Sequence, residues 1–181
     1  MATILTVSAS PSPISKTAST RRLVDERLIA LGHSVEALDV RDLPAAALLA
    51  ADARDPAIAA AVDAFERAHG VVVATPVYKA SYSGLLKTLL DLLPQRALAD
   101  KIVLPLATGG TLAHVLVLDY ALRPVLTALG SPHIVQGHFL LDQSITLSHA
   151  RAELTADAGD ALNRAVDRFA DALDRTAVLA S

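Results

Sequence analysis

Short apolar runs alternate with longer amphipathic segments along almost the whole chain, and this alternation constrains the fold more than any other feature of the sequence. Apolar runs of a few residues are typical of buried strands, and apolar residues at every third or fourth position are typical of helices. Strands are therefore expected at residues 3–7, 34–38, 71–74 and 102–107, with a fifth within 133–139. Because strands that alternate with helices build βαβ units, the sequence predicts an α/β fold with a doubly wound, five-stranded parallel sheet and helices on both faces.

Helices are expected between these strands and after the last one. Their apolar stripes, and the Gly and Pro residues at their ends, place them at residues 23–31, 57–69, 85–93, 112–129 and 162–173. The connection over residues 39–56 is long and only partly ordered by its leucines. The segment 112–129 is apolar almost all round, so it must be buried on two sides, either by the chain's own core or by another subunit.

Composition limits the classes of protein that the chain can represent. With 181 residues, of which 52% are hydrophobic and 19% charged, residues 1–181 suit one compact domain. The formal net charge of −3 is too balanced for non-specific nucleic-acid binding. The start of the chain lacks the basic region of a secretory signal, and no apolar run reaches the about 20 residues that span a bilayer. We therefore expect a soluble cytoplasmic protein without nucleic-acid or membrane partners.

Metal centres and nucleophilic catalysis have little support in the sequence. The chain has no cysteine, which excludes disulfides, iron–sulfur clusters and cysteine-ligated zinc. Its six histidines, at positions 33, 69, 114, 133, 138 and 149, show no metal-binding spacing, so no metal site is predicted. The chain also lacks the G-x-S-x-G elbow of serine hydrolases.

Three loops are the candidate location of a functional site. In open parallel sheets, ligands bind beyond the carboxyl ends of the strands. The loops expected there are residues 8–17, 75–84 and 108–114. The first contains five hydroxyl residues and one lysine before a helix. Because the N-terminus of a helix favours anions, this loop predicts a site for a single phosphate group.

The residues of the first loop are compatible with two interpretations, a phosphate-binding site or an ordinary loop before a helix. It contains no glycine, so neither the dinucleotide motif nor the Walker motif is present, and a pyrophosphate or a triphosphate fits it poorly. The other reading is an ordinary Ser/Pro-rich loop in which Ser15 or Thr17 caps the helix. In the second loop, Tyr78 and Tyr82 lie between Pro76 and Gly84, and they either face a ligand or pack the loop itself.

Longer motifs add a resemblance to a known family. Residues 75–78 (TPVY) with 83–94 (SGLLKTLLDLLP) strongly resemble the flavodoxin-like NAD(P)H-dependent FMN reductases. Residues 104–114 (LPLATGGTLAH) and 119–126 (DYALRPVL) are similar to the reductase components of two-component alkanesulfonate monooxygenases. The resemblance extends to about residue 139 and weakens through the last helix.

The resemblance implies an activity and a set of site residues. The fold would be flavodoxin-like, and the reaction would be hydride transfer from NADPH, or NADH, to FMN. The FMN phosphate would lie in the first loop, and the flavin ring would lie against the second and third loops, with His114 either at the pyrimidine or simply at a helix start. The implied cofactor-binding residues are Ser10, Ser15, Lys16, Thr17, Pro76, Val77, Tyr78, Thr108, Gly109, Gly110 and His114.

The resemblance also implies an assembly and a partner. Residues 112–129 would form the interface of a dimer or tetramer, and Tyr120 would have a catalytic role on a one-residue π-bulge beside the flavin. The alternative is that Tyr120 fills a gap in the core, with Pro124 as the cause of any kink. Reduced FMN would go to a flavin-dependent monooxygenase. Ser12 stands where such reductases usually have arginine, which predicts weaker FMN binding.

Two other activities suit the same fold. One is a quinone or azo reductase that retains its FMN. The other is a flavodoxin-type electron carrier, which would not oxidise NAD(P)H.

Overall fold

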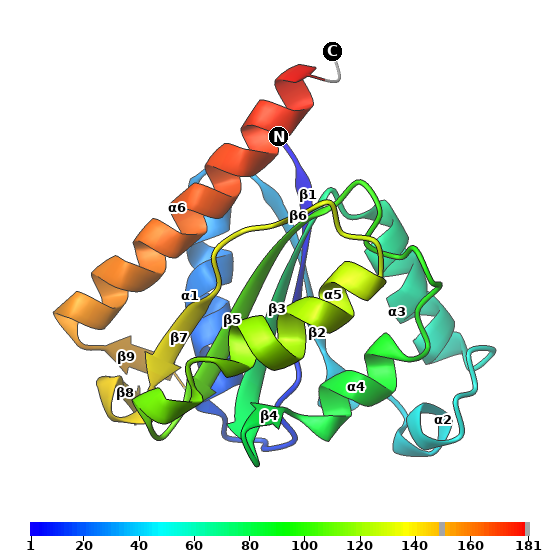
Figure 1. Ribbon diagram of the computed structural model, residues 1–181, viewed down its shortest axis with the longest axis horizontal. Coiled ribbons are helices and arrows are strands. Elements are labelled where there is room, and N and C mark those ends of the chain that lie inside the picture. Colours follow the sequence, from blue (N-terminus) through cyan, green and yellow to red (C-terminus); the bar gives the residue numbers. More distant parts are fainter. Residues whose placement is uncertain (149–150, 180–181) are drawn as a thin grey trace.

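A parallel β-sheet forms the centre of the molecule in the computed structural model, which describes residues 1–148 and 151–179 (Figure 1). The strand order is β2-β1-β3-β5-β6, with β7 also paired to β5. All of these pairs are parallel, and the order is that of a doubly wound, flavodoxin-like sheet, so the predicted fold class is confirmed. The strands are β1 (Thr3–Ser8), β2 (Ser34–Asp39), β3 (Gly70–Tyr78), β5 (Ile102–Gly109), β6 (His133–Ile134) and β7 (His138–Leu141).

Helices cover both faces of this sheet (Figure 1). The helices α1 (Lys16–Ala30) and α6 (Ala156–Leu179) pack on one face. On the other face lie α3 (Pro56–Arg67), α4 (Gly84–Leu90) and α5 (Arg123–Ala128). No helix in the described part of the chain is both long enough and apolar enough to cross a membrane.

The central strands explain why the sheet is buried on both sides. Alternate residues of β3 enter different cores: Val71 and Val73 pack with α3 and α4, whereas Val72 packs with α1 and α6. In β5, Val103 and Leu104 divide between the two cores in the same way. The sequence of a strand that is apolar on both faces is a continuous run of hydrophobic residues, and this is the pattern that predicts these strands.

The fifth strand is not continuous. Val103 is paired with Ile134, but Leu106 is paired with His138, so one extra residue lies between β6 and β7. The break lies opposite Pro105, which has no N–H to donate to a neighbouring strand. Gly137 lies against this proline, and a Cβ at Gly137 would be 3.1 Å from the carbonyl oxygen of Pro105. The predicted strand within 133–139 is therefore two short strands separated by a bulge.

The predicted helix 112–129 is also not one regular α-helix. It begins as a 3₁₀ turn, η2 (Leu112–His114), continues as a π-helical turn, η3 (Leu118–Leu122), and ends as α5. The π-helical turn implied by the family resemblance is thus present around Tyr120. Burial is one-sided: Leu118, Leu122 and Leu126 enter the core, whereas Leu116 is 56% exposed.

Short elements that were not predicted complete the fold. The connection after β2 contains η1 (Val40–Asp42) and α2 (Ala45–Leu49). After β3 the chain folds back as β4 (Ser81–Tyr82), and after β7 it forms η4 (Asp142–Ser144). The antiparallel hairpin of β8 (Ile145–Ser148) and β9 (Arg151–Leu154) packs against α1.

Candidate functional site

Four connections meet at the carboxyl edge of the sheet. They are residues 9–15 after β1, the β3–β4 hairpin, residues 110–117 after β5, and η4 after β7. Three of the four are the loops that the sequence singled out. The fourth, η4, was missed because the end of the fifth strand was not placed.

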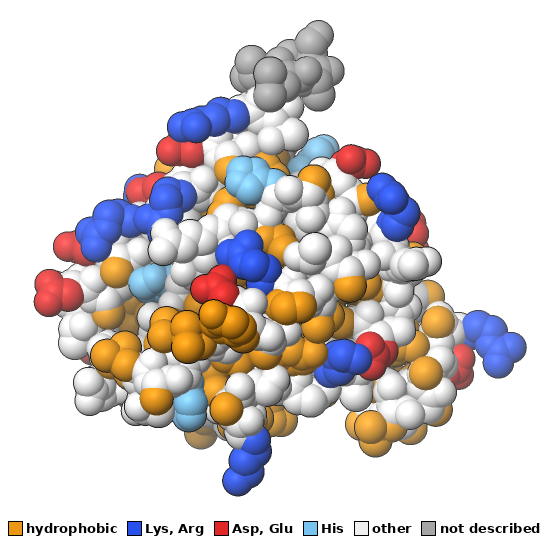
Figure 2. Space-filling view, in the orientation of Figure 1, with side chains coloured by type: hydrophobic (Ala, Val, Ile, Leu, Met, Phe, Trp, Pro, Cys, Tyr) orange, Lys and Arg blue, Asp and Glu red, His pale blue; other side chains and the backbone are white. Residues whose placement is uncertain are grey.

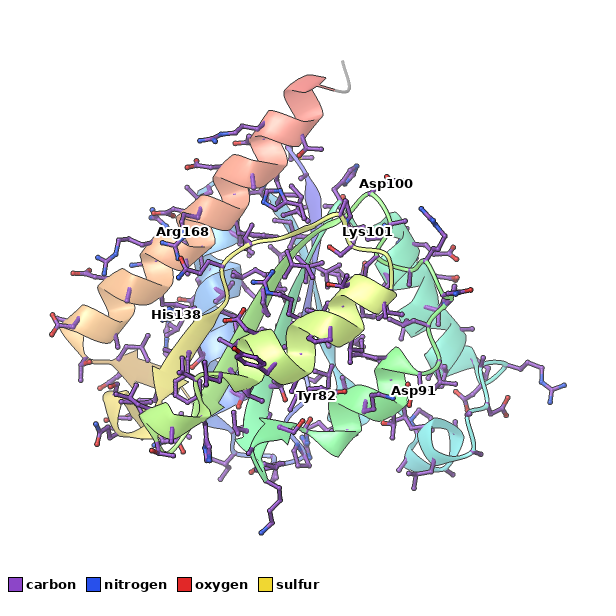
Figure 3. All side chains as sticks on the ribbon, in the orientation of Figure 1. Tyr82, Asp91, Asp100, Lys101, His138 and Arg168 are labelled. Carbon is purple, nitrogen blue, oxygen red and sulfur yellow. The ribbon has the colours of Figure 1, made fainter. Side chains whose placement is uncertain are left out.

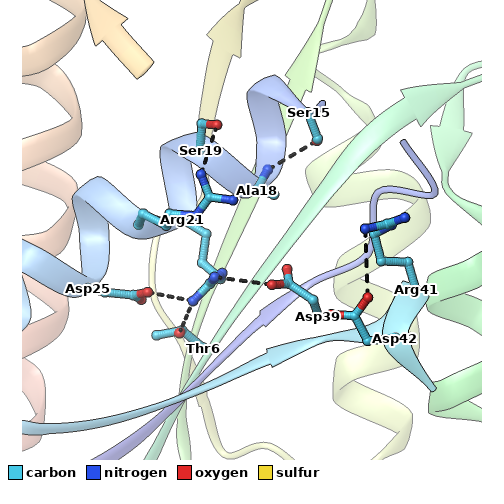
Figure 4. A network of polar contacts seen from close by, with 10 residues as sticks. Thr6, Ser15, Ala18, Ser19, Arg21, Asp25, Asp39, Arg41 and Asp42 are labelled. Atoms are coloured by element: carbon cyan, nitrogen blue, oxygen red, sulfur yellow. Dashed lines mark hydrogen bonds and ion pairs between the residues drawn. The ribbon is translucent and has the colours of Figure 1, made fainter. Parts of the chain in front are cut away.

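The first loop is held by its own hydroxyl groups. The Oγ of Ser10 is buried and accepts a hydrogen bond from the N–H of Ser12, at 3.3 Å. The Oγ of Ser12 donates to the carbonyl oxygen of Ile14, at 2.6 Å. The Oγ of Ser15 accepts from the N–H of Ala18, at 3.1 Å, so Ser15 is the N-cap of α1 (Figure 4). The capping role is confirmed, and the cap also aims the N-terminus of α1 at the edge of the sheet.

Two hydrogen-bonding contacts join the start of α1 to the end of β5 and to the turn η4. The buried hydroxyls of Thr17 and Thr108 lie 2.6 Å apart and join α1 to the end of β5. Lys16 extends toward η4, where its Nζ donates to the carbonyl oxygen of Asp142, at 2.5 Å. Thr17 is therefore close to the third loop as well as to the first, and Lys16 is close to η4.

The second loop is joined to the first through Ser83. Its Oγ donates to the carbonyl oxygen of Ala9, at 2.7 Å, and accepts from the N–H of Leu86 as the N-cap of α4. The Oγ1 of Thr75 accepts from the N–H of Ser83, at 2.9 Å. Neither Thr75 nor Ser83 was a candidate in the sequence. A serine directly before a helical repeat is a capping signal, and it would have identified Ser83.

The tyrosines of the second loop differ in their surroundings. Tyr82 is half-buried and packs against the core, as the loop-packing reading expects. Tyr78 is 47% exposed at the end of β3, so it does not pack the loop. Pro76 is buried and Val77 is half-buried beside it. The exposed side chain of Tyr78 is accessible to a ligand.

The third loop is shaped by two glycines. A Cβ at Gly109 would lie 3.0 Å from the Phe139 ring and 3.4 Å from the Cβ of Val77, so a larger residue would require the Phe139 ring to shift. Gly110 is exposed, and apart from its chain neighbours the Oδ2 of Asp142 is the only atom of the described residues within 4 Å of the position that its Cβ would take, at 3.9 Å. The backbone of Gly110 is therefore open to a ligand.

His114 is the last residue of the third loop, and Tyr120 follows it along the chain. The Nδ1 of His114 is buried and has no hydrogen-bond partner among the described residues. Because buried polar atoms are usually paired, an unpaired ring nitrogen beside this loop is suited to a polar ligand group. Tyr120 is 78% exposed, so the reading in which it fills a gap in the core is wrong. Its neighbour Asp119 forms an ion pair with Arg123, at 3.0 Å.

The residues of this edge fit the FMN that the resemblance implies. Hydroxyl groups and the N-terminus of α1 suit a phosphate, as does the absence of an acidic residue from the loop itself. The open backbone of Gly110 and the unpaired Nδ1 of His114 suit the polar edge of a flavin ring. The structure brings the predicted residues of the three loops to one edge, and their individual roles remain predictions.

A buried charge network lies behind the first loop (Figure 4). The guanidinium of Arg21 donates to Asp25, at 2.5 Å, and to Thr6 and Asp39, at 3.3 and 3.4 Å. Burial raises the pKa of Asp25, although Thr6 and Arg21 act in the opposite direction. This network connects α1 to β1 and β2 and thus fixes the helix whose N-terminus faces the site.

Other charged groups lie away from the site. Lys87 and Asp91, four residues apart, form an ion pair at the surface, at 2.6 Å, and the hydrogen bond that Lys87 donates to Asp91 raises the pKa of Lys87. Within residues 1–148 and 151–179, no group of three His, Asp or Glu side chains is placed to hold a metal ion. His149 lies outside the described residues.

Comparisons with known proteins show which family the chain resembles over most of its length. Residues 2–146 match the family model described as NADPH-dependent FMN reductase. The chain is 43% identical over 172 residues to an FMN reductase (NADPH) of Escherichia coli strain K12, covering 95% of this chain and 90% of that protein. It is also similar to the apo structure of an NADH:FMN oxidoreductase (EMOB), with a TM-score of 0.85, 45% identity, and coverage of 93% and 88%.

A more distant structure agrees on the fold alone. A flavodoxin from Streptococcus pneumoniae TIGR4 superposes with a TM-score of 0.65 at 14% identity, over 94% of this chain and 99% of that one.

Proposed function

Because the chain belongs to the NADPH-dependent FMN reductase family, we propose that it transfers a hydride from NAD(P)H to FMN at the carboxyl edge of β1, β3 and β5. The observation that carries this proposal is the convergence of the three predicted loops on that edge, where Thr17 touches Thr108 and Ser83 touches Ala9. FMN supplies a ring that accepts two electrons, and the protein supplies binding and orientation.

The first loop is the proposed phosphate site. Ser10, Ser15 and Thr17 provide hydroxyl groups, and α1 provides backbone N–H groups and the positive end of its dipole. Ser15 accepts a hydrogen bond through its Oγ, so its O–H can still donate to a phosphate oxygen. Lys16 adds a positive charge from the first turn of the helix.

The second and third loops are the proposed ring site. The ring would lie against Val77 and Tyr78, next to the buried Pro76, and the exposed Gly110, which follows Thr108 and Gly109 at the end of β5, would present backbone polar groups to it. His114 would pair its free Nδ1 with the polar edge of the ring. Hydride transfer between stacked rings needs orientation rather than a nucleophile or a general acid. Tyr120, whose exposed side chain is accessible from solvent, would contact the ring.

A direct assay tests the function. Purified protein is given NADPH or NADH together with FMN, FAD or riboflavin, and oxidation of the nicotinamide is followed by absorbance. We expect FMN to be the best acceptor and NADPH the better donor. A protein that copurifies with stoichiometric yellow FMN and turns over little free FMN would instead be a quinone or azo reductase. Reduction of bound FMN without any NAD(P)H oxidation would indicate an electron carrier.

An assembly and a partner are part of the same proposal. Four apolar side chains of residues 112–120 are exposed, and hydrophobic side chains gather over this part of the surface (Figure 2). A second copy of the chain would cover them, giving a dimer or tetramer. The reaction draws on the NAD(P)H pool of the cytoplasm, and its product would pass to a flavin-dependent monooxygenase such as one that oxidises alkanesulfonates. The four side chains are Leu112, Val115, Leu116 and Tyr120.

A further inference from the structure

The turn that follows β7 holds a carboxylate beside the third loop. β7 ends at Leu141, and Asp142 is the first residue of η4. The Oδ2 of Asp142 is 3.9 Å from the position that a Cβ of Gly110 would occupy. Gly110 is exposed, whereas Asp142 is half-buried. A carboxylate therefore lies beside the exposed Gly110, at the proposed ring site.

This carboxylate has no counter-ion in the described part of the chain. No ion pair or hydrogen bond is found for its oxygens among residues 1–148 and 151–179. Lys16 is the nearby cation, but its Nζ donates to the main-chain carbonyl oxygen of Asp142 and lies beyond ion-pair distance of the carboxylate. The contact holds the turn in place from α1, and the carboxylate oxygens of Asp142 form no ion pair with Lys16.

We propose that Asp142 makes the site bind oxidised FMN more tightly than reduced FMN and thereby promotes release of the product. This inference rests on the proposed function. The oxidised flavin ring is neutral. A hydride brings two electrons and one proton to N5, and the nicotinamide leaves with the compensating positive charge, so the reduced ring carries a negative charge at N1 unless it takes up a second proton. A fixed carboxylate nearby raises the free energy of that anion but not of the neutral ring.

If Asp142 acted through a hydrogen bond and not through its charge, the pattern of its effects on the two affinities, for oxidised and for reduced FMN, would be different. A carboxylate that only accepts a hydrogen bond from a ring N–H would strengthen the binding of both redox states, because that N–H is present in both. A carboxylate that acts by charge changes the ratio of the two affinities. The ratio of the dissociation constants is therefore the quantity to measure.

The test compares Asp142→Asn with Asp63→Asn. Asparagine keeps the shape of the side chain and removes its charge, and Asp63 is an exposed carboxylate on α3, so its variant makes the same change of net charge elsewhere. Dissociation constants are measured for oxidised FMN and, under anaerobic conditions, for reduced FMN, at low and high salt. We expect Asp142→Asn to tighten binding of reduced FMN about three- to tenfold, with less than about a twofold change for oxidised FMN. High salt should shrink the difference.

Other outcomes overturn the inference in distinguishable ways. Equal changes for both redox states, or no change in either, would exclude discrimination by charge while leaving the reductase function intact. The same effect in Asp63→Asn would attribute it to net charge. If the unmodified protein binds neither form of FMN, the proposed function fails and the inference fails with it. Lys16→Gln tests whether the hydrogen bond from Lys16 to the carbonyl oxygen of Asp142 holds the carboxylate in place. In the Lys16→Gln background, the effect of Asp142→Asn on the binding of reduced FMN should be smaller. An undiminished effect would exclude a role for Lys16.

Discussion

Ser12 closes the first loop on itself at the position where the family resemblance implies an arginine. Its Oγ donates to the carbonyl oxygen of Ile14, and its N–H donates to Ser10. These bonds shape the loop without adding a charge. The loop residues 9–15 contain no Lys or Arg, so Lys16 is the cation next to them in the sequence, and it is engaged with η4.

Ser12→Arg should therefore tighten FMN binding. A charge-assisted hydrogen bond contributes roughly 1.5–3 kcal/mol, and the lost Ser12–Ile14 bond costs about 1 kcal/mol, so we expect a gain on the order of tenfold in affinity. Fluorescence titration with FMN measures it. Ser12→Gln provides a control of similar length without charge. An arginine variant that binds no better than the glutamine variant would contradict the argument.

His138 gives the protein a sensitivity to mild acid. Burial lowers the pKa of His138, and the nearby guanidinium groups of Arg168 and Arg164 lower it further (Figure 3). The unfolded chain therefore takes up a proton near pH 6.5, at a higher pH than the folded protein does. The stability that the neutral imidazole contributes is complete above that pH and is lost as the pH falls toward the lower, folded-state pKa.

We expect His138→Gln to lose less stability than the unmodified protein when the pH falls from neutral to the range below the ordinary histidine pKa. Urea unfolding at a series of pH values measures the difference. His133→Gln, at an exposed position on β6, is the matched control. Parallel pH profiles for the unmodified protein and His138→Gln would show that His138 does not contribute.

At the scale of the element, α1 shows why a buried helix face need not be apolar. Its inner face includes Thr17, Thr20 and Arg21, all nearly inaccessible to solvent. The Arg21 side chain is 4% exposed and reaches Asp25 on its own helix and Asp39 at the end of β2. Because these partners come from two elements, the guanidinium fixes how α1 lies on the sheet.

Arg21→Met should destabilise the fold. Removing one partner of a buried ion pair leaves the carboxylates of Asp25 and Asp39 uncompensated, which typically costs about 3–5 kcal/mol in the free energy of unfolding. Urea denaturation measures it. Arg151→Met is the control, since Arg151 pairs with Glu26 at an exposed site, where such pairs contribute about 1 kcal/mol or less. Similar losses in the two variants would contradict a structural role for the buried network.

The same elements show what the sequence allows one to predict. Central strands such as β3 and β5 were predicted because both of their faces are apolar, which is a local pattern. The break between β6 and β7 was missed because its cause, Pro105, lies on the neighbouring strand. The network of Arg21 was missed for a similar reason, since Asp39 meets it only through the parallel pairing of β1 with β2.

At the scale of the whole molecule, topology explains why the site was easier to predict than its contacts. The carboxyl ends of parallel strands meet at one edge whatever the details of the loops, so three loops could be assigned to a common site. The contacts between Thr17 and Thr108, and between Lys16 and Asp142, join residues that are far apart in the sequence. No periodicity or motif reports such contacts.

The exposed apolar side chains of residues 112–120 provide the last prediction. The chain buries one side of this segment itself, so if a second copy covers the other side, a charge there should prevent assembly. Leu116 is 56% exposed, and Leu116→Glu should leave the fold of the single chain intact while reducing the mass of the particle in sedimentation velocity. Leu49→Glu is the control, because Leu49 is 80% exposed on α2, away from this surface. An unmodified protein that sediments as a monomer, or a Leu116→Glu variant with an unchanged mass, would show that this surface has another role.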